Sequence, residues 1–360
     1  MTIVIKVGTQ AILAENGAPM EKTLENLTGQ IAQLMQSGQQ VALVSSGAVG
    51  SGRHVARGLL GREYGKTTGE KQLLAAMGQH ELMRAYAALF APHGIAVAQL
   101  LLTKQDFHTR LHYLNIARLL REVTRQKNVL PIINENDSVS IEELMFTDND
   151  ELSGLIAAQM NADKLVILTS VDGVYDGHPD NPQSRKIDII DPKKDIWPEA
   201  HAGKTTQGRG GMATKLGTAR KMSDMGIATH IASLKTDNVL LRIAAGEGVG
   251  TTVLPRTRKS SLKKWMAFSG SAQGGQITVN AKLADILRSG EKAISLLPVG
   301  IESTAGDFKK GDLIDIIDPK GSKIGIGIAR YGADRLREYM GQKGKPEIIH
   351  YDHLHIRTGG

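Results

Sequence analysis

The sequence predicts an α/β protein, with a mostly parallel central sheet covered by helices on both faces, followed by a small C-terminal β-barrel. Three observations support this prediction. The 360 residues are enough for two domains with separate cores. Strand-like and helix-like segments alternate along the first part of the chain. Beyond Trp265, in contrast, the segments are short and rich in glycine and β-branched residues, with little helical periodicity.

The first part of the chain begins with a β-α-β unit. Residues 3–7 predict a strand buried on both faces, and apolar residues at helical spacing over 24–35 predict a helix that Gly38 ends. The stretch "QVALVSSGAVGSG" predicts a buried strand that runs into a glycine-rich turn. We expect further strands at 95–102, 129–133 and 165–169, with helices between them at 72–90, 112–126 and 152–160. This alternation is typical of parallel sheets.

The change of character near "PRTRKSSLKKW" predicts a domain boundary. We expect an α/β domain at 1–254, a basic linker at 255–264 and a β-barrel domain at 265–360. "QITVN", "DLIDIID" and "SKIGIGIARY" predict strands of the barrel, because they are rich in β-branched residues and are bounded by glycines.

Composition excludes several classes of function. The chain contains no cysteine, which excludes disulfides, thiolate nucleophiles and cysteine-ligated zinc. The longest apolar stretch, at 86–102, is interrupted by proline, histidine, glycine and glutamine, and no basic segment followed by an apolar run begins the chain. We therefore expect a cytoplasmic protein with neither a membrane span nor a signal peptide.

The formal charge of +7 lies in one part of the chain. Residues 1–255 hold 26 basic and 26 acidic side chains, whereas residues 256–360 hold 18 basic and 11 acidic ones. The excess favours a polyanionic partner such as RNA. A solvated surface with a chance imbalance is an equally good interpretation.

Lys6 stands within the first predicted strand. A buried ammonium group is costly without an anionic partner. Either the strand lies at an edge of the sheet and Lys6 faces water, or Lys6 faces an anion. The first strand alone leaves both interpretations open.

Three polar stretches lie at the ends of predicted strands or at the start of a predicted helix. "SSGAVGSG" at 45–52 offers backbone N–H groups for anionic oxygens, but it fits neither the P-loop pattern nor the dinucleotide-binding fingerprint. "INEND" at 133–137 ends a strand, and "FTDND" at 146–150 precedes a helix. Ligands bind at strand ends in α/β sheets, so two Asx-rich clusters on successive elements indicate a site. Each cluster taken alone could be an ordinary turn or cap.

Two further segments favour a nucleotide. "TSVDGVYDGHP" at 169–179 lacks the glutamate that a calcium loop needs, so the rim of a nucleotide site is the better interpretation. "GRGGMATKL" at 208–216 combines loop amides, the start of a predicted helix and Lys215, which suits a polyphosphate. A flexible surface loop is the alternative for this segment.

Eight ordered motifs resemble the amino acid kinase family over nearly the whole chain: "IVIKVGT", "LVSSGAVGSG", "AAMGQHELM", "QLLLT", "PIINENDSV", "FTDND", "LTSVDGVY" and "GRGGMATKL". The resemblance implies an amino acid kinase-like sandwich for the α/β part. Beyond the linker, "AISLLPVGI", "GDFKKGDLIDI" and "PEIIHYDHLHI" are similar to the PUA domain, a small β-barrel of many RNA-modifying proteins.

The resemblance is closest to the branch that phosphorylates the γ-carboxylate of L-glutamate with ATP, the first step of proline biosynthesis. It implies catalytic roles for Lys6, Asp150 and Lys215, and binding of glutamate by Ser46, Asp137 and Asn149. Mg²⁺ would be bound mainly through ATP, with no protein ligand assigned. Because the γ-carboxylate is ionised at neutral pH and is itself the nucleophile, no strong general base is needed. The implied contacts with ATP are made by Lys6, Thr169, Ser170, Arg209, Gly210, Gly211, Met212, Ala213, Thr214 and Lys215.

Three residues depart from the family pattern, namely Thr147, Ser170 and Arg209, and each concerns the nucleotide contacts. Related kinases of acetylglutamate, aspartate or carbamate are one alternative, and an RNA-binding protein that acts through its C-terminal barrel is another. The resemblance also implies a homo-oligomer (a dimer or tetramer), inhibition by proline and a glutamyl-phosphate reductase as partner.

Overall fold

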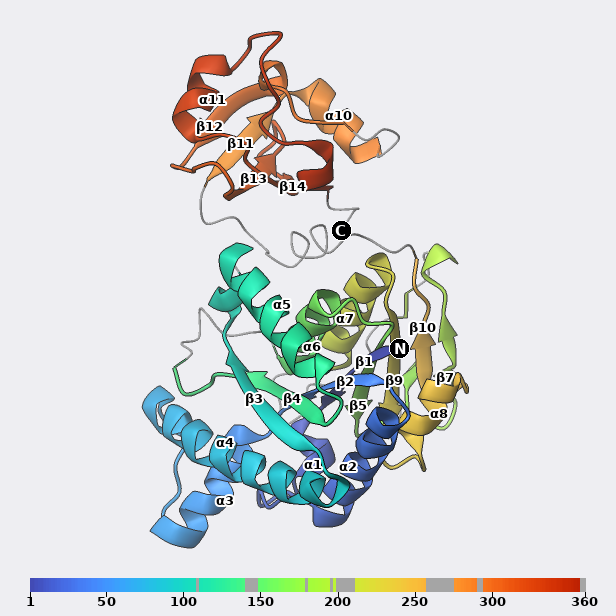
Figure 1. Cartoon of the computed structure of the whole chain (residues 1–360). Helices are drawn as coiled ribbons and strands as arrows, with labels where there is room; N and C mark the ends of the chain where they lie inside the picture. Colours follow the sequence, from blue (N-terminus) through green and yellow to red (C-terminus); the bar gives the residue numbers. More distant parts are fainter. Residues whose placement is uncertain are drawn as a thin grey trace. The chain divides into compact units, whose positions relative to one another are not determined.

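The computed structural model describes residues 1–107, 110–139, 148–178, 181–194, 197–198, 211–256, 275–289 and 294–356. The chain forms two compact units, one made of residues 1–104 and 115–259 and the other of residues 105–114 and 260–360. Each unit has its own sheet (Figure 1). No helix in the described part of the chain is long and apolar enough to cross a membrane.

An eight-stranded sheet forms the centre of the first unit. Six neighbouring strands, β3, β4, β2, β1, β5 and β9, are parallel, as expected. The short strand β10 runs antiparallel to β9. β8 pairs in parallel with β10. In spatial order the strands are β3 (Ala96–Leu102), β4 (Val129–Glu135), β2 (Gln40–Ser45), β1 (Thr2–Val7), β5 (Lys164–Thr169), β9 (Ala228–Ser233), β10 (Thr251–Val253) and β8 (Ile189–Ile190).

Helices cover both faces of this sheet (Figure 1). One layer holds α2 (Glu21–Gln36), α4 (Thr68–Phe90) and α8 (Val239–Ala245), and the other holds α5 (Arg110–Arg125), α6 (Asn149–Gln159) and α7 (Met212–Asp224). Period-two alternation along β1 explains where Lys6 points. Ile3, Ile5 and Val7 join the core cluster that includes the apolar residues of α2, so Lys6 faces the layer of α6 and α7. The remaining short elements are α1 (Thr9–Ile12) and the ribbon of β6 (Val174–Tyr175) with β7 (Lys186–Ile187).

The glycine-rich stretch after β2 is a helix rather than a turn from Ala48 onwards, so that prediction was wrong. Only Ser46 and Gly47 form the turn, and α3 (Ala48–Leu60) follows and packs on α4. A Cβ atom on Gly52 would lie 1.9 Å from the carbonyl oxygen of Leu74, and one on Gly78 would lie 1.8 Å from that of Ala48. The glycines therefore permit close contact between two helices, and flexibility is not their purpose here.

The second unit contains a five-stranded mixed sheet in the order β12 (Ile301–Ala305), β11 (Gln276–Val279), β13 (Leu313–Ile317), β14 (Lys323–Ile328) and β15 (Leu354–Ile356). The three strands expected from sequence are present as β11, β13 and β14. Two helices, α10 (Ala281–Ser289) and α11 (Ala333–Tyr339), were not expected. They were not predicted because their apolar faces are short. The side chain of Asn280 stabilises the start of α10 by accepting a hydrogen bond from the Leu283 amide (2.9 Å).

Candidate active site

A cavity of about 460 Å³ opens at the carboxyl ends of the central strands of the first unit. Gly8 follows β1, Ser46 follows β2, Asp137 follows β4 and Ser170 follows β5, and all four residues line the cavity. Parallel strands end at one edge of the sheet, so their connections converge there. The cavity therefore lies where ligands bind in this class of fold.

Two lysines share one buried carboxylate at the floor of the cavity. Lys6 Nζ lies 2.6 Å from Asp150 Oδ1, and Lys215 Nζ lies 2.9 Å from Asp150 Oδ2. The side chain of Asp150 is fully buried, and those of Lys6 and Lys215 are 7% and 9% exposed. β1 lies between β2 and β5, so the interpretation of Lys6 as an edge-strand residue in water was wrong.

The charges in this cluster do not balance. Burial alone would raise the pKa of the Asp150 carboxyl, but the two ammonium groups outweigh burial and hold that pKa below its ordinary value. Asp150 is therefore a single negative charge between two positive ones, and the nearby Asp148 carboxyl group has a raised pKa because of burial and the Asp150 carboxylate, which favours its neutral form. Since Lys6 and Lys215 also line the cavity, the surplus positive charge is available to a ligand. Anionic oxygens such as those of a polyphosphate would complete the cluster.

The start of α6 holds Asp150 in place. Asp148 is the N-cap residue of the helix and accepts hydrogen bonds from the backbone amides of Asp150 (2.9 Å) and Glu151 (3.1 Å). Burial and the nearby Asp150 carboxylate raise the pKa of Asp148. Thr214 on α7 also donates weakly to Asp150 Oδ2 (3.4 Å). These contacts fix the carboxylate before any ligand arrives.

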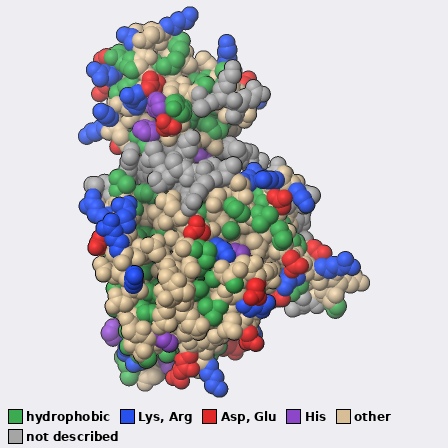
Figure 2. All heavy atoms as spheres, turned by 45° about the vertical axis from the view of Figure 1, so that its right-hand side comes forward, with side chains coloured by type: hydrophobic (Ala, Val, Ile, Leu, Met, Phe, Trp, Pro, Cys, Tyr) green, Lys and Arg blue, Asp and Glu red, His purple; other side chains and the backbone are tan. Residues whose placement is uncertain are grey.

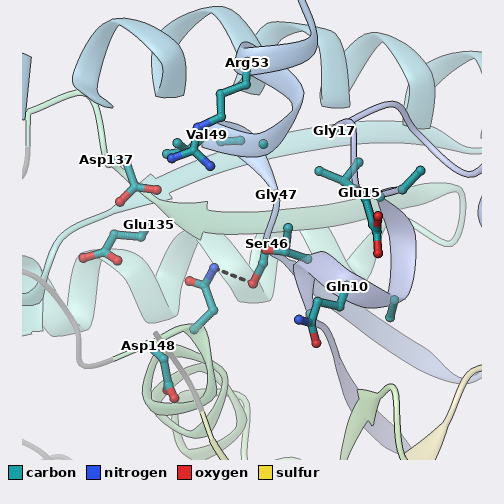
Figure 3. A pocket seen from close by; sticks show the side chains of 18 of the residues that line it. Gln10, Glu15, Gly17, Ser46, Gly47, Val49, Arg53, Glu135, Asp137 and Asp148 are labelled. Atoms are coloured by element: carbon teal, nitrogen blue, oxygen red, sulfur yellow. Dashed lines mark hydrogen bonds between the residues drawn. The ribbon is translucent and has the colours of Figure 1, made fainter. Parts of the chain in front are cut away.

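An amide network places the three residues predicted to bind the acceptor. Asn149 Nδ2 donates to Ser46 Oγ and to Asn134 Oδ1, both at 2.9 Å, and Asn134 in turn donates to Gln79 (2.8 Å). The hydrogen bond that Ser46 accepts is the dashed line in Figure 3, which also shows Asp137 further along the same cavity. Ser46, Asp137 and Asn149, from three separate connections, all line this cavity.

The residues predicted to bind the nucleotide are only partly together. Thr169 and Ser170 line the cavity with Lys6 and Lys215. The segment Gly211–Thr214 begins α7, where the Gly211 amide donates to Thr214 Oγ1 (3.1 Å), but its residues do not line the cavity. Arg209, Gly210 and Thr147 lie outside the described residues.

Sequence reasoning missed three basic residues of the cavity wall: Arg53 and Arg57 on α3, and Lys71 on α4. They were missed because the segment that begins at Ala48 was not predicted to be a helix. Val49, Arg53 and Arg57 recur every four residues, which places them on one helix face. The expectation of a turn at this point hid that periodicity.

Comparisons with known proteins agree with the architecture. The model of the amino acid kinase family matches residues 1–233, and that of the PUA domain matches residues 275–350. A glutamate 5-kinase of Chlorobaculum tepidum is 46% identical over 98% of this chain and 97% of its own length. A glutamate 5-kinase of Bacteroides thetaiotaomicron is 44% identical over 98% of both chains. A glutamate 5-kinase of Thermus thermophilus is 35% identical over 99% of this chain and 97% of its own.

The fold and the lysine cluster define an α/β kinase with an appended PUA domain. The family match covers more than half of the chain, and the relatives match nearly all of it. The chain belongs to the amino acid kinase family, and within it to the glutamate 5-kinases.

Proposed function

We propose that the protein transfers the γ-phosphoryl group of ATP to the γ-carboxylate of L-glutamate, which gives γ-glutamyl phosphate and ADP. The observation that carries this proposal is the pair of buried lysines sharing Asp150 at the floor of a cavity, within a chain similar throughout to glutamate 5-kinases. This reaction is the first step of proline biosynthesis, and we infer that it occurs in the cytoplasm.

The lysines act on the phosphoryl group during transfer. A carboxylate oxygen of glutamate forms a bond to the γ-phosphorus while the bond from phosphorus to the bridging oxygen breaks, and ADP leaves with that electron pair. Charge spreads over the transferring oxygens, and positioned cations stabilise it. Lys6 and Lys215 supply those cations, and Asp150 orients both ammonium groups.

We infer that Ser46 and Asn149 orient the glutamate carboxylate that reacts, and that Asp137 binds the free ammonium group. The hydroxyl and amide are already joined by a hydrogen bond, so little ordering is needed on binding. A carboxylate at position 137 would leave an N-acetylated substrate without its charge partner. This chemistry favours glutamate over acetylglutamate.

The nucleotide contacts remain as proposed from sequence: Thr169 and Ser170 at the cavity wall, and the segment 209–214 with Lys215. The surplus positive charge beside Asp150 suits the phosphates of ATP. In the described residues no group of three or more His, Asp or Glu side chains could hold a metal ion. From the resemblance to the family we propose that Mg²⁺ is bound mainly through ATP and adds positive charge at the phosphates.

The remaining assignments concern assembly and the C-terminal part. We propose a catalytic domain at 1–254, a linker at 255–264 and a PUA-like domain at 265–360. A homo-oligomer, inhibition by proline and a glutamyl-phosphate reductase as partner are further proposals. Weak RNA binding by the C-terminal domain is supported by its excess of basic residues. On the face shown in Figure 2, however, acidic groups lie among the basic ones of this unit.

An assay of ATP-dependent hydroxamate formation tests the reaction directly. Glutamate, acetylglutamate and aspartate are offered side by side, with the Asp150→Asn variant as the control for contaminating kinases. We expect product with glutamate, far less with the other two acceptors, and almost none with the variant. Preference for acetylglutamate or aspartate, or equal activity of the variant, would overturn the proposal.

A further inference from the structure

The proposed glutamate site lacks a partner for one charge of its ligand. A free amino acid carries an ammonium group and a carboxylate on one carbon atom, so a site that selects it needs an anion and a cation side by side. Asp137 is the anion, whereas Ser46 and Asn149 are uncharged. Lys6 and Lys215 both contact Asp150 at the floor of the cavity. The cation for the α-carboxylate is missing from this set.

Arg53 has the position and the chemistry to be that cation. It projects from α3 and lines the cavity. Figure 3 shows its guanidinium group reaching into the cavity on the same side as Asp137. Arg53 forms no ion pair with any other described residue, whereas Arg57, one turn further along α3, is paired with Glu63 at 2.9 Å.

The guanidinium group of Arg53 lies beside the loop between α3 and α4. Gly65 has a φ of +115°, and a Cβ atom there would lie 3.4 Å from two nitrogen atoms of Arg53, so the guanidinium lies against the bare backbone. The Glu70 carboxylate accepts hydrogen bonds from the backbone amides of Gly65, Lys66 and Thr67 at 3.1, 2.7 and 3.2 Å. These hydrogen bonds order the loop, so it presents a defined backbone surface beside the guanidinium group of Arg53.

We propose that Arg53 binds the α-carboxylate of the acceptor amino acid next to the ammonium group that Asp137 binds. A guanidinium can form two parallel hydrogen bonds with a carboxylate, which a lysine cannot do. Arg53 is thus a specificity-determining residue that selects a free α-amino acid over other molecules with a terminal carboxylate. This inference rests on the proposed function, because it assigns a further part of the glutamate site.

Steady-state kinetics with two acceptors test it. L-Glutamate is compared with its α-carboxamide, isoglutamine, which keeps the γ-carboxylate and the ammonium group but lacks the α-carboxylate. With the wild type we expect glutamate to be much the better acceptor. Arg53→Gln should lower kcat/KM for glutamate by about 10- to 100-fold, mainly through KM, and leave isoglutamine nearly unchanged. The KM for ATP should stay within about twofold.

Conservative and matched variants complete the experiment. Arg53→Lys keeps the charge but loses the paired hydrogen bonds, so its KM for glutamate should lie between those of the wild type and Arg53→Gln. Arg62→Gln is the control, because Arg62 lines only the neighbouring hollow and rests over Tyr64. It should leave both acceptors unchanged.

The possible outcomes separate this inference from the proposed function. A wild type that phosphorylates neither acceptor would contradict the function itself. If the wild type is active and Arg53→Gln lowers kcat/KM equally for glutamate and isoglutamine, the assignment of Arg53 is overturned. Loss of discrimination in Arg57→Gln or Lys71→Gln, with Arg53→Gln unaffected, would move the carboxylate site to those residues and would equally overturn it.

Discussion

The two units both bury charged side chains, but they balance them differently. In the first unit, Lys6 and Lys215 share the single carboxylate of Asp150. In the second unit, buried Asp318 pairs with Arg288 and also accepts hydrogen bonds from the backbone amides of Lys320 and Ser322 at 2.9 and 2.7 Å. Buried charge that is fully paired fixes local structure, whereas a surplus of buried charge indicates a place for a ligand.

The largest expected effect tests the surplus of buried positive charge in the first unit. Lys215→Ala should lower kcat by about 100-fold or more, because its ammonium group is used mainly as charge develops on the transferred phosphoryl group. KM for glutamate should change much less. The matched control is Lys323→Ala in the second unit, which removes a paired lysine 2.6 Å from Asp315. Steady-state kinetics should show the wild-type kcat for the control, and a kcat of Lys215→Ala within a few-fold of wild type would contradict the assignment.

A second test concerns a buried base that stays neutral. Burial and then the charge of Lys164 lower the pKa of His230 to about 4. The unfolded chain binds a proton on this histidine near pH 6.5. The free energy of unfolding should therefore fall as the pH drops from about 6.5 to about 4, by about 3 kcal/mol over the whole range.

Urea denaturation at a series of pH values measures this effect. His230→Gln should flatten the profile over that range, whereas His80→Gln, at an exposed position, should not. An unchanged slope in His230→Gln would show that His230 becomes protonated in the folded state. The first unit would then hold a third buried cation, and its buried positive charge would differ even more from the paired charges of the second unit.

A third test sharpens the contrast within the cavity. Asp137→Asn removes a charge and hardly changes shape, so it should weaken glutamate binding about tenfold and leave ATP binding nearly intact. Isothermal titration with each ligand measures both affinities. Equal losses for the two ligands would mean that Asp137 supports the cavity as a whole and does not bind the ammonium group.

The smallest expected effect comes from removing the C-terminal segment of the second unit, residues 260–360. A chain that ends near Thr257 should fold and phosphorylate glutamate at close to the wild-type rate, because every residue assigned to catalysis lies in the first unit. Assembly and the response to proline should differ only if residues 260–360 take part in them, which gel filtration and inhibition curves would report. Insoluble or inactive truncated protein would refute separability.

The isolated C-terminal part provides the companion measurement. We expect weak affinity for RNA that falls steeply with salt, through the basic groups Lys263, Lys264, Lys309, Lys310, Arg335 and Arg337. Lys263 and Lys264 lie outside the described residues, and Arg337 pairs with Asp334. Fluorescence anisotropy at low salt decides the matter, and no detectable binding would leave this unit as an assembly or regulatory element.

Much of the fold could be predicted because the longer helices and strands have a regular spacing of apolar residues. The parallel strands and the helices over 72–90, 112–126 and 152–160 were placed within a few residues. α3 was missed because glycines usually indicate turns, and only a tertiary contact explains Gly52 and Gly78 in a helix. The helices of the second unit were missed because their periodic stretches are short.

The site could be predicted as far as the family motifs reach. The residues of the lysine cluster were found from the motifs, but their direct contact through Asp150 depends on the packing of α6 against α7. Arg53 could not be found, because its place at the cavity depends on α3 being helical and on the course of the loop at Gly65. The four-residue spacing of Val49, Arg53 and Arg57 is a local signal for the helix face, but only the tertiary structure shows that this face lines the cavity.

The contact of Gly52 and Gly78 determines how this enzyme could be redesigned. Neither position accepts a side chain, so α3 and α4 can be recombined with segments of a relative only as one block that carries both glycines. The exposed loop residues Arg62, Glu63 and Lys66 lie outside that contact. A library confined to these loop positions would therefore vary the hollow next to the cavity, which they line, and would leave both the helix contact and the assigned site residues unchanged.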